Sequence, residues 1–369
     1  MEEDKIIIIR KEKSFPFKKV KIKKDRKGNN NNYNKLFSTK IIFIFSLSFL
    51  SILIIIQFFI IYNLKMNQNK KSYAKENAIN NTKYDINFSY EDYDTEIITD
   101  KIKKDSKWIL SLDEAKFING LIRKNRLKKC LEIGVARGGS SILILNAIKD
   151  LDDSILVSLD LNKELFNSPH KLTGYRVNKY FPELTKKWKL LTGEQPHKFL
   201  VDLNIKFDFL FLDTVHVSPG KILNFIEALP FLNENAIIVL HDLLWHFKII
   251  PNSKLYPSCI SLIPSLYGDI IFLNRKEKGI SNMGAVFLYP NQEKHYLNYF
   301  LLLLNFWEYI PKDNQINELR AFIQNYYKDE IYINIFDAAV EQNKKANENF
   351  IKHKKSIAKK FLVNLGTKW

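Results

Sequence analysis

Four carboxylates stand at or beside the ends of apolar runs in the middle of the chain, and they are the residues best placed to do chemistry. Glu132 and Asp160 close the first two runs, and Asp213 and Asp242 come at the ends of two later runs. Carboxylates can hold a diol through paired hydrogen bonds, or bind a hard divalent cation through oxygen. A single acid at a strand end is commonly a cap, so the hypothesis depends on the recurrence of the pattern.

A glycine-rich turn joins the first of these acids to a following helix. Residues 130–142 read Cys-Leu-Glu-Ile-Gly-Val-Ala-Arg-Gly-Gly-Ser-Ser-Ile. The pattern Glu-x-Gly-x-x-x-Gly differs from the Gly-x-Gly-x-x-Gly turn that receives the pyrophosphate of a dinucleotide. It therefore favours a cofactor without a pyrophosphate, and the alternative is a tight turn that binds no ligand.

The elements that must position these residues alternate between strand and helix. The strands are almost continuously apolar, as strands buried on both faces are. The pattern predicts an α/β fold with a Rossmann-like, doubly wound, mostly parallel sheet of seven strands, in which ligands bind at the carboxyl ends of the strands. The expected strands span 129–133, 154–160, 188–192, 207–213, 236–241, 269–274 and 284–289, and the expected helices between them span 140–149, 196–204 and 219–229.

Two helix starts carry recognisable signals. Ser111 and Glu114 form a capping box before a helical apolar pattern. Ser218 is expected to cap the helix that begins at Pro219. The segment 162–186 shows no clear period and is expected to be irregular.

An uncharged segment of 24 residues, 41–64, lies between Lys40 and Lys65. As a helix it would be about 36 Å long, which is enough to cross a hydrocarbon core of about 30 Å. The segment is too long for a cleavable signal peptide, and no small-residue cleavage site follows it. The sequence therefore predicts a single-pass membrane protein.

The rest of the chain divides by composition into further parts. Residues 1–40 are expected to be a basic, disordered tail, and residues 65–107 a polar stem or linker. A folded catalytic domain is expected over 108–290, beginning near Trp108, and a helical extension over 291–369. The apolar run 301–307 is expected to be a packing face, which would suit a homodimer.

The formal net charge is +17, and residues 1–40 contribute 13 Lys and Arg against 5 Asp and Glu. The chain has no basic stripe interleaved with aromatic residues, so nucleic-acid binding is not expected. Its two cysteines cannot build a disulfide framework. Cys130 leads into an apolar strand and is expected to be a small buried hydrophobic residue.

The segment from Glu132 to Ser140 resembles motif I of the class I S-adenosylmethionine-dependent methyltransferases. The resemblance runs from about residue 110 to 290 and is closest to the small-molecule O-methyltransferase branch. Cephalosporin-hydroxylase-like proteins share the same sequence motif. In such proteins the glycine turn approaches the amino acid part of the cofactor, the acid ending the second strand holds the ribose hydroxyls, and the loop after the third strand lies by the adenine. The cofactor-binding residues implied are Glu132, Gly134, Ala136, Gly138, Gly139, Ser140, Asp160, Gly193 and Glu194.

The resemblance also implies catalytic residues. In the metal-dependent branch Asp213 and Asp242 would bind Mg²⁺, and His216, three residues after Asp213, would be the base. The chain departs from that branch, because Leu243 stands where a third ligand, Asn, is common. Thr214 and Asn235-Ala236 likewise replace glycines. These departures leave a second interpretation open, in which the acids cap strands or bind substrate without a metal.

Other residues near the strand ends are less specific. His241 is expected to point back into the sheet, and Trp245, His246 and Phe247 are expected to line an acceptor pocket or to cover the sheet edge.

The sequence thus predicts a membrane-anchored O-methyltransferase that acts on a hydroxyl of a glycan or another small molecule. The alternatives are a non-catalytic, cofactor-binding interaction module and a hydroxylase-like or nicotinamide-dependent oxidoreductase. Charge bias around residues 41–64 favours a luminal or external catalytic domain, whereas the cytosolic synthesis of S-adenosylmethionine favours a cytosolic one.

Overall fold

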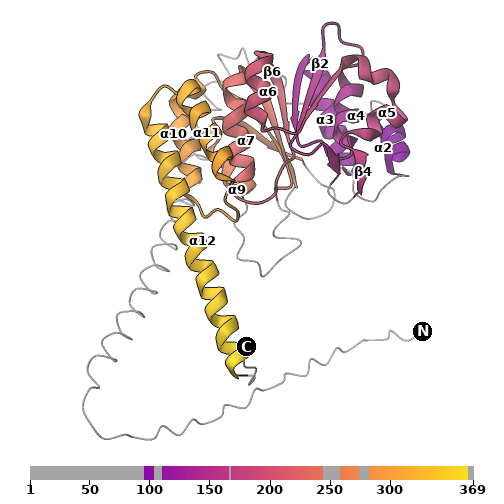
Figure 1. Ribbon diagram of the computed structural model, residues 1–369. Coiled ribbons are helices and arrows are strands. Elements are labelled where there is room, and N and C mark those ends of the chain that lie inside the picture. The colour runs from indigo at the N-terminus through magenta and orange to yellow at the C-terminus, as the bar shows by residue number, and fades with distance from the viewer. Residues whose placement is uncertain (1–94, 104–109, 166–167, 244–257, 274–281, 365–369) are drawn as a thin grey trace, which may run out of the picture. The chain divides into compact units, whose positions relative to one another are not determined.

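The computed structural model describes residues 95–103, 110–165, 168–243, 258–273 and 282–364 (Figure 1). All of these residues belong to one compact unit. The predicted basic tail, the segment 41–64 and most of the predicted linker lie outside the described residues.

A seven-stranded sheet forms the centre of the molecule, in the order β5-β2-β1-β6-β7-β9-β8. The first five strands in this order are parallel, β9 pairs antiparallel to β7, and β8 pairs antiparallel to β9. The predicted Rossmann-like, mostly parallel sheet is confirmed. The strands are β1 (Lys129–Ile133), β2 (Ile155–Asp160), β5 (Trp188–Thr192), β6 (Phe207–Leu212), β7 (Leu232–His241), β8 (Gly268–Phe272) and β9 (Met283–Leu288).

The strands are apolar on both faces because helices cover both faces (Figure 1). Leu131 and Ile133 of β1 belong to one buried cluster and Cys130 to the other, so alternate side chains enter opposite halves of the core. The first cluster includes side chains of α6 (Pro196–Leu203), α7 (Gly220–Ala228), α9 (Ser258–Ser265), α10 (Tyr296–Leu301), α11 (Asp313–Tyr326) and α12 (Glu330–Asn364). The second includes side chains of α2 (Thr95–Lys103), α3 (Leu112–Lys124), α4 (Gly139–Ile148) and α5 (Tyr175–Tyr180).

Helix α2 lies within the segment expected to be a linker, so the expectation that the folded domain begins near Trp108 is corrected. Ile102 is fully buried in the second cluster. The buried side chain of Asn119 on α3 donates a hydrogen bond of 3.2 Å to Thr95 Oγ1. Helix α2 is too short and too polar for its helical periodicity to be recognised in the sequence. Its packing on α3 makes it part of the fold. The capping box of Ser111 and Glu114 at the start of α3 is present as predicted.

The segment expected to be irregular contains a small hairpin and a short helix. It consists of β3 (Glu164–Leu165), β4 (Ser168–Leu172), α5 and the 3-10 helix η1 (Pro182–Lys187). Gly174 N donates to Ala136 O at 2.8 Å, and Arg176 N donates to Arg137 O at 3.2 Å. This insertion therefore packs directly on the glycine turn after β1.

Helix α7 begins one residue later than predicted. Gly220 is its first residue, Pro219 stands at the cap position, and Ser218 makes no capping bond through its side chain. The backbone of Ser218 is bound instead by Glu308, which places Ser218 in the loop before the helix.

The helices after β9 belong to the same core as the sheet. They are η3 (Gln292–His295), α10, η4 (Leu302–Leu304), α11 and α12. Leu303 and Trp307 are fully buried in the first cluster, whereas Leu301 is 44% exposed. The run 301–307 is thus a packing face within its own chain, and the homodimer that it would suit stays a prediction.

The predicted membrane location is also corrected. Among the described residues, no helix combines the length and the apolar character needed to cross a bilayer. The segment 41–64, on which the prediction rested, lies outside the described residues.

We predict that Trp307→Ala lowers the free energy of unfolding by about 3–5 kcal/mol, because it leaves a cavity where a large side chain was fully buried. Leu301→Ala, on the exposed side of the same run, should change it by about 0.5 kcal/mol or less. Urea unfolding of the two variants checks this. Equal losses would contradict the placement of the run in the core.

Candidate active site

The residues that the sequence singled out meet at the carboxyl ends of the parallel strands. Gly134 N donates to Leu159 O at 2.9 Å, and Asp213 N donates to Ile133 O at 3.0 Å. Gly193 N donates to Asp160 O at 3.0 Å. In the sheet β2 lies on one side of β1 and β6 lies on the other. The chain therefore crosses in one direction from β1 to β2 and later returns in the other direction to reach β6, so the strand order switches at the end of β1. This is the place where open α/β sheets bind ligands.

The glycine turn is fixed by close contacts with the neighbouring loop. Gly134 has φ +93°, and a Cβ on it would lie 2.0 Å from Asp213 O. Gly138 has φ +87°, and a Cβ there would lie 3.1 Å from Gly174 Cα. The backbone conformation and the lack of space both require glycine at these two positions. The turn therefore lies between the loop after β6 and the insertion before α5.

Glu132 supports this turn from the inside of the protein, and its side chain is fully buried. Ser140 Oγ donates to its Oε1 at 2.5 Å, and Ser141 Oγ and Ser158 Oγ both donate to its Oε2 at 2.6 Å. Both oxygens of Glu132 are thus bound by serines inside the protein, so in this structure Glu132 supports the turn, and its contact with a cofactor stays a prediction. Burial raises the pKa of Glu132 to about 7, although the serine hydrogen bonds oppose the rise.

Asp160 closes the turn from the side of β2. Its Oδ2 accepts hydrogen bonds from Val135 N at 2.9 Å and from Ala136 N at 3.0 Å. Its Oδ1 accepts one from Asn162 N at 2.9 Å. A carboxylate has about four lone-pair sites, so Asp160 can bind this backbone through three of them and accept about one further hydrogen bond, on Oδ1, from a ligand.

Glu194 follows the end of β5 and is exposed. Lys198 Nζ donates to its carboxylate at 2.9 Å, and this hydrogen bond is the main reason that the pKa of Glu194 is lowered. Lys198 also lies 3.1 Å from Glu318 on α11. Surface pairs of this kind contribute little to stability.

A second group lies beside the turn and consists of Asp213, His216 and Asp242. One ligand atom from each side chain lies within 4.8 Å of the others. Asp213 follows β6, His216 is in the loop 213–219, and Asp242 follows β7. His216 Nδ1 is 3.4 Å from Asp242 Oδ2. The other oxygen of Asp242 accepts a hydrogen bond of 2.8 Å from Asn282 Nδ2.

His241 also faces this group, so the expectation that it points back into the sheet is corrected. Its Nδ1 lies 3.2 Å from Asp213 Oδ1 and 3.4 Å from Asp242 Oδ2, and its Nε2 lies 3.6 Å from Glu114 Oε1. Burial alone would lower the pKa of His241, but the three carboxylates outweigh burial and raise it well above its ordinary value.

The charge of His241 also shifts the pKa values of the three carboxylates around it. Burial raises the pKa values of Asp213 and Asp242, but the charge of His241 and its interactions with them leave both below their ordinary values. The pKa of Glu114 is lowered to about 2, because His241 and the capping bonds of Ser111 outweigh burial.

His216 has the opposite shift. Burial lowers its pKa, the charge of Lys221 lowers it further, and the attraction of Asp213 and Asp242 does not offset the two. Lys221 is fully buried, and its Nζ donates a hydrogen bond to His241 O. His216 is therefore a neutral imidazole near pH 7, beside a histidine that is charged.

Sequence reasoning missed the roles of Glu114, Lys221 and Asn282. Glu114 was recognised only as part of a capping box, and the other two stand outside any motif. Their positions in the site depend on which helix or loop packs over the strand ends. Trp245, His246 and Phe247, expected near an acceptor, lie outside the described residues.

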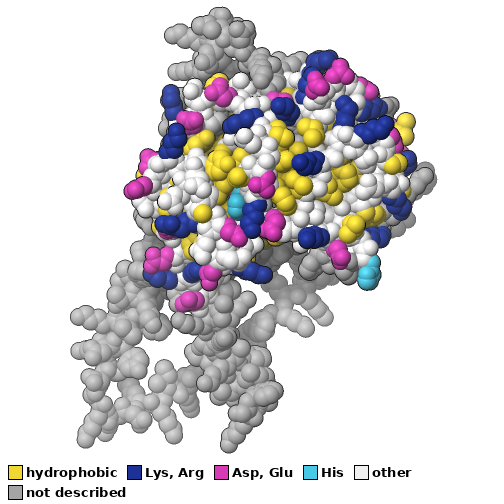
Figure 2. Space-filling model, turned by 45° about the horizontal axis from the view of Figure 1, so that its top comes forward, with side chains coloured by type: hydrophobic (Ala, Val, Ile, Leu, Met, Phe, Trp, Pro, Cys, Tyr) yellow, Lys and Arg dark blue, Asp and Glu magenta, His cyan; other side chains and the backbone are white. Residues whose placement is uncertain are grey.

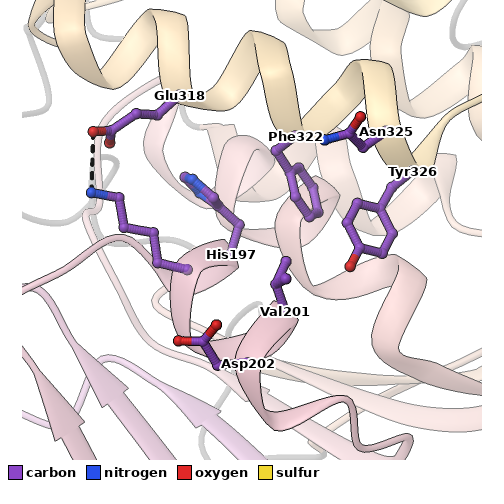
Figure 3. A pocket seen from close by; sticks show the side chains of 8 residues that line it. His197, Val201, Asp202, Glu318, Phe322, Asn325 and Tyr326 are labelled. Carbon is purple, nitrogen blue, oxygen red and sulfur yellow. Dashed lines mark ion pairs between the residues drawn. The ribbon is translucent and has the colours of Figure 1, made fainter.

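A separate groove of about 660 Å³ lies between α6 and α11 (Figure 3). Apolar side chains of Val201, Phe322 and Tyr326 and the ring of His197 line it, and the Lys198–Glu318 pair stands at one end. None of the predicted site residues lines this groove. The candidate active site is therefore placed at the strand ends, where the hydrogen bonds of the predicted residues converge.

On the face drawn in Figure 2, apolar patches lie among interspersed positive and negative side chains.

Comparison with known proteins agrees with a candidate site at the ends of the parallel strands. Residues 131–243, just under a third of the chain, match a family model described as a methyltransferase domain. This range begins in β1 and ends just after Asp242. The predicted resemblance to methyltransferases is therefore confirmed for this part of the chain. Among curated proteins, none matches the chain significantly.

Several solved structures are similar to part of the chain. A putative O-methyltransferase from Klebsiella pneumoniae is 16% identical with a TM-score of 0.41, over 53% of this chain and 89% of that one. The O-methyltransferase TomG from Streptomyces achromogenes, in complex with SAM, is 16% identical with a TM-score of 0.40, over 55% and 92%. An O-methyltransferase from Bacillus cereus, in complex with SAH, is 19% identical with a TM-score of 0.40, over 53% and 91%. Likeness at this level does not define a function.

We predict that Glu132→Gln changes how stability depends on pH. A glutamate ionises near 4.5 in the unfolded chain and near 7 here, so the folded state holds the extra proton between these values. Wild type therefore loses stability as pH rises through this window, and the variant does not. Relative to Glu132→Gln, the free energy of unfolding of wild type should fall by about 3 kcal/mol from pH 4.5 to above 7.

Urea unfolding at pH 4.5 and pH 8 measures this difference. Glu183→Gln, at an exposed glutamate of η1, is the control and should follow wild type. A wild-type protein that gains stability relative to Glu132→Gln with rising pH would contradict the burial argument.

Proposed function

We propose that this chain transfers a methyl group from S-adenosylmethionine to a hydroxyl group of a small molecule. The proposal is supported above all by the meeting, at one edge of the sheet, of a glycine turn braced by Asp160 and an ionisable cluster that includes a neutral histidine. The match of residues 131–243 to a methyltransferase domain supports it independently.

The turn after β1 and the ends of β2 and β5 are the parts suited to the cofactor. Gly134 and Gly138 leave no side chains on the turn, so a ligand can approach the backbone closely. Asp160 keeps about one lone pair, on Oδ1, free for a ribose hydroxyl, while its three backbone contacts fix its position. Gly193 N is bound to Asp160 O, and this contact supports the proposal that the following loop lies by the adenine. Bound there, S-adenosylmethionine supplies a methyl group on a positively charged sulfur.

His216 is the group suited to take the proton of the acceptor hydroxyl. With Nδ1 facing Asp242, the tautomer protonated at Nδ1 leaves Nε2 as a base. Asn282 fixes Asp242 through its other oxygen, so the orienting carboxylate is itself held. As the proton leaves, the hydroxyl oxygen forms the new bond to the methyl carbon, the bond from that carbon to sulfur breaks, and the sulfur becomes neutral. Much of the acceleration would come from alignment of the two reactants.

A divalent cation is a further proposal for the same cluster. Asp213 and Asp242 offer oxygen atoms close enough to share an ion, and His216 offers a nitrogen. The donor set fits a divalent cation, although Leu243 replaces one oxygen ligand of the metal-dependent branch. Such an ion would lower the pKa of the acceptor hydroxyl. His241 and Lys221 already place two positive charges beside these carboxylates, so the proposed proton transfer to His216 does not require an ion.

The proposed acceptor is a small hydroxylated molecule, and a sugar hydroxyl is one class to test. The experiment is methyl transfer from radiolabelled S-adenosylmethionine to a panel of phenols, sugars and hydroxy acids, with and without Mg²⁺. If the cofactor binds but no acceptor is methylated, the interpretation as a non-catalytic, cofactor-binding module replaces this one.

We predict that His216→Ala lowers turnover by about 10²–10⁴-fold, because it removes a general base. The dissociation constant for S-adenosylmethionine should stay within about twofold of wild type, since the glycine turn and Asp160 are untouched. His170→Ala, at an exposed histidine of β4, is the matched control and should leave both quantities unchanged. Turnover within a few-fold of wild type in His216→Ala would remove His216 from this role.

A further inference from the structure

The loop that carries His216 is held by a residue of the C-terminal helical segment. Ser218 N donates a hydrogen bond of 2.9 Å to Glu308 Oε2, and Glu308 N donates one of 2.9 Å to Ser218 O. These reciprocal bonds join residues 90 positions apart. Ser218 is only 2% exposed, so few other partners are available to its backbone.

The same segment touches the loop at a second place. A Cβ on Gly220 would lie 3.2 Å from the hydroxyl oxygen of Tyr309 and 2.7 Å from Val215 Cβ. Tyr309 is therefore against the start of α7, where the loop ends. Asp213 N is bound to Ile133 O at the beginning of the loop, so the loop is fixed at both ends, and His216 stands between them.

Helix α12 in turn fixes the segment that contains Glu308. Trp307 N donates to Asn343 Oδ1 at 2.7 Å, and Asn347 Nδ2 donates to Trp307 O at 3.1 Å. Asn343 Nδ2 also donates to Asn305 O at 3.2 Å. Trp307 is fully buried and Asn343 is 1% exposed. A continuous set of contacts, buried at Trp307 and Asn343 and part-buried at Glu308, thus runs from α12 to the His216 loop.

We propose that Glu308 is a positioning residue for His216, and that the C-terminal helices set the geometry of the catalytic loop. The proposal rests on the proposed role of His216. Loss of the Glu308 side chain leaves Ser218 N without its acceptor, and of the two reciprocal bonds only the one from Glu308 N to Ser218 O then holds the loop. A displacement of about 1 Å at a catalytic group can cost up to about a hundredfold in rate. The proposed cofactor residues lie at or just after the ends of β1, β2 and β5, outside the loop that Glu308 holds, so the affinity for S-adenosylmethionine should be preserved.

The experiment compares four full-length variants. Glu308→Ala removes the acceptor, Glu308→Gln keeps an oxygen acceptor, and Glu308→Asp shortens the side chain while keeping its charge, in case the alanine variant does not fold. Glu341→Ala removes an exposed partner of Lys345 on α12 and is the matched control. Turnover, affinity for S-adenosylmethionine and hydrogen exchange of the backbone from 213 to 220 are measured in each.

In Glu308→Ala and Glu308→Asp we expect turnover to fall by about ten- to a hundredfold and the Ser218 amide to exchange faster, with cofactor affinity within about twofold of wild type. Glu308→Gln should retain turnover and protection, and Glu341→Ala should match wild type. Unchanged exchange at Ser218 in both Glu308→Ala and Glu308→Asp would overturn the proposal. Faster exchange with wild-type turnover would overturn it as well.

A readout that needs no turnover separates this proposal from the proposed function. The imidazole signals of His216 in histidine-labelled protein should shift or broaden in Glu308→Ala and Glu308→Asp but not in Glu308→Gln. If wild type transfers no methyl group, the proposed function fails, and these signals still decide whether Glu308 positions His216. Signals that match wild type in all variants would overturn the positioning role.

Discussion

The site depends on the close approach of Gly134 to the carbonyl group of Asp213. A side chain on Gly134 would lie 2.0 Å from that oxygen, so only glycine lets the turn after β1 pass beside the loop after β6. This contact brings the proposed cofactor turn and the acidic cluster to one edge of the sheet. Glu132 supports the turn from inside, where three serine hydroxyls bind both of its oxygens. The proposed transfer chemistry requires both groups to share this edge.

Electrostatics gives the two histidines of the cluster different states. His241 lies among Asp213, Asp242 and Glu114 and is charged, whereas His216 is shifted toward the neutral form by burial and by the charge of Lys221. Two titratable groups whose surroundings push their pKa values apart are typical of a site that separates acid from base roles. The neutral histidine is the one in the loop, and its side chain is 36% exposed.

Much of the fold could be predicted from sequence, because each strand carries its own signal. Leu131, Val157 and Phe211 belong to short runs that are apolar on both faces, and such runs indicate strands of a covered parallel sheet. The glycine turn and the acids at the strand ends were also recognisable, since their spacing along the chain is short. Helix α2 was missed because its polar sequence becomes helical and buried only through its packing on α3.

The parts of the site that sequence could not give depend on contacts between distant residues. The position of Glu132 in the turn is visible in the sequence, while its burial by Ser158 from the next strand is not. His241 and Glu114 meet only when α3 packs over the strand ends, and Glu308 reaches Ser218 across 90 positions. The membrane prediction rested on residues 41–64 alone, and the described helices gave it no support.

The most direct test of the account is a calorimetric titration of the full chain with S-adenosylmethionine, beside Asp160→Ala and a parallel titration with NAD(H). The account predicts micromolar binding to wild type, binding weakened by about 1–3 kcal/mol in Asp160→Ala, since hydrogen bonds to a charged acceptor are lost, and no preference for NAD(H). A folded wild-type protein that does not bind S-adenosylmethionine, or that binds NAD(H) more tightly, would contradict it.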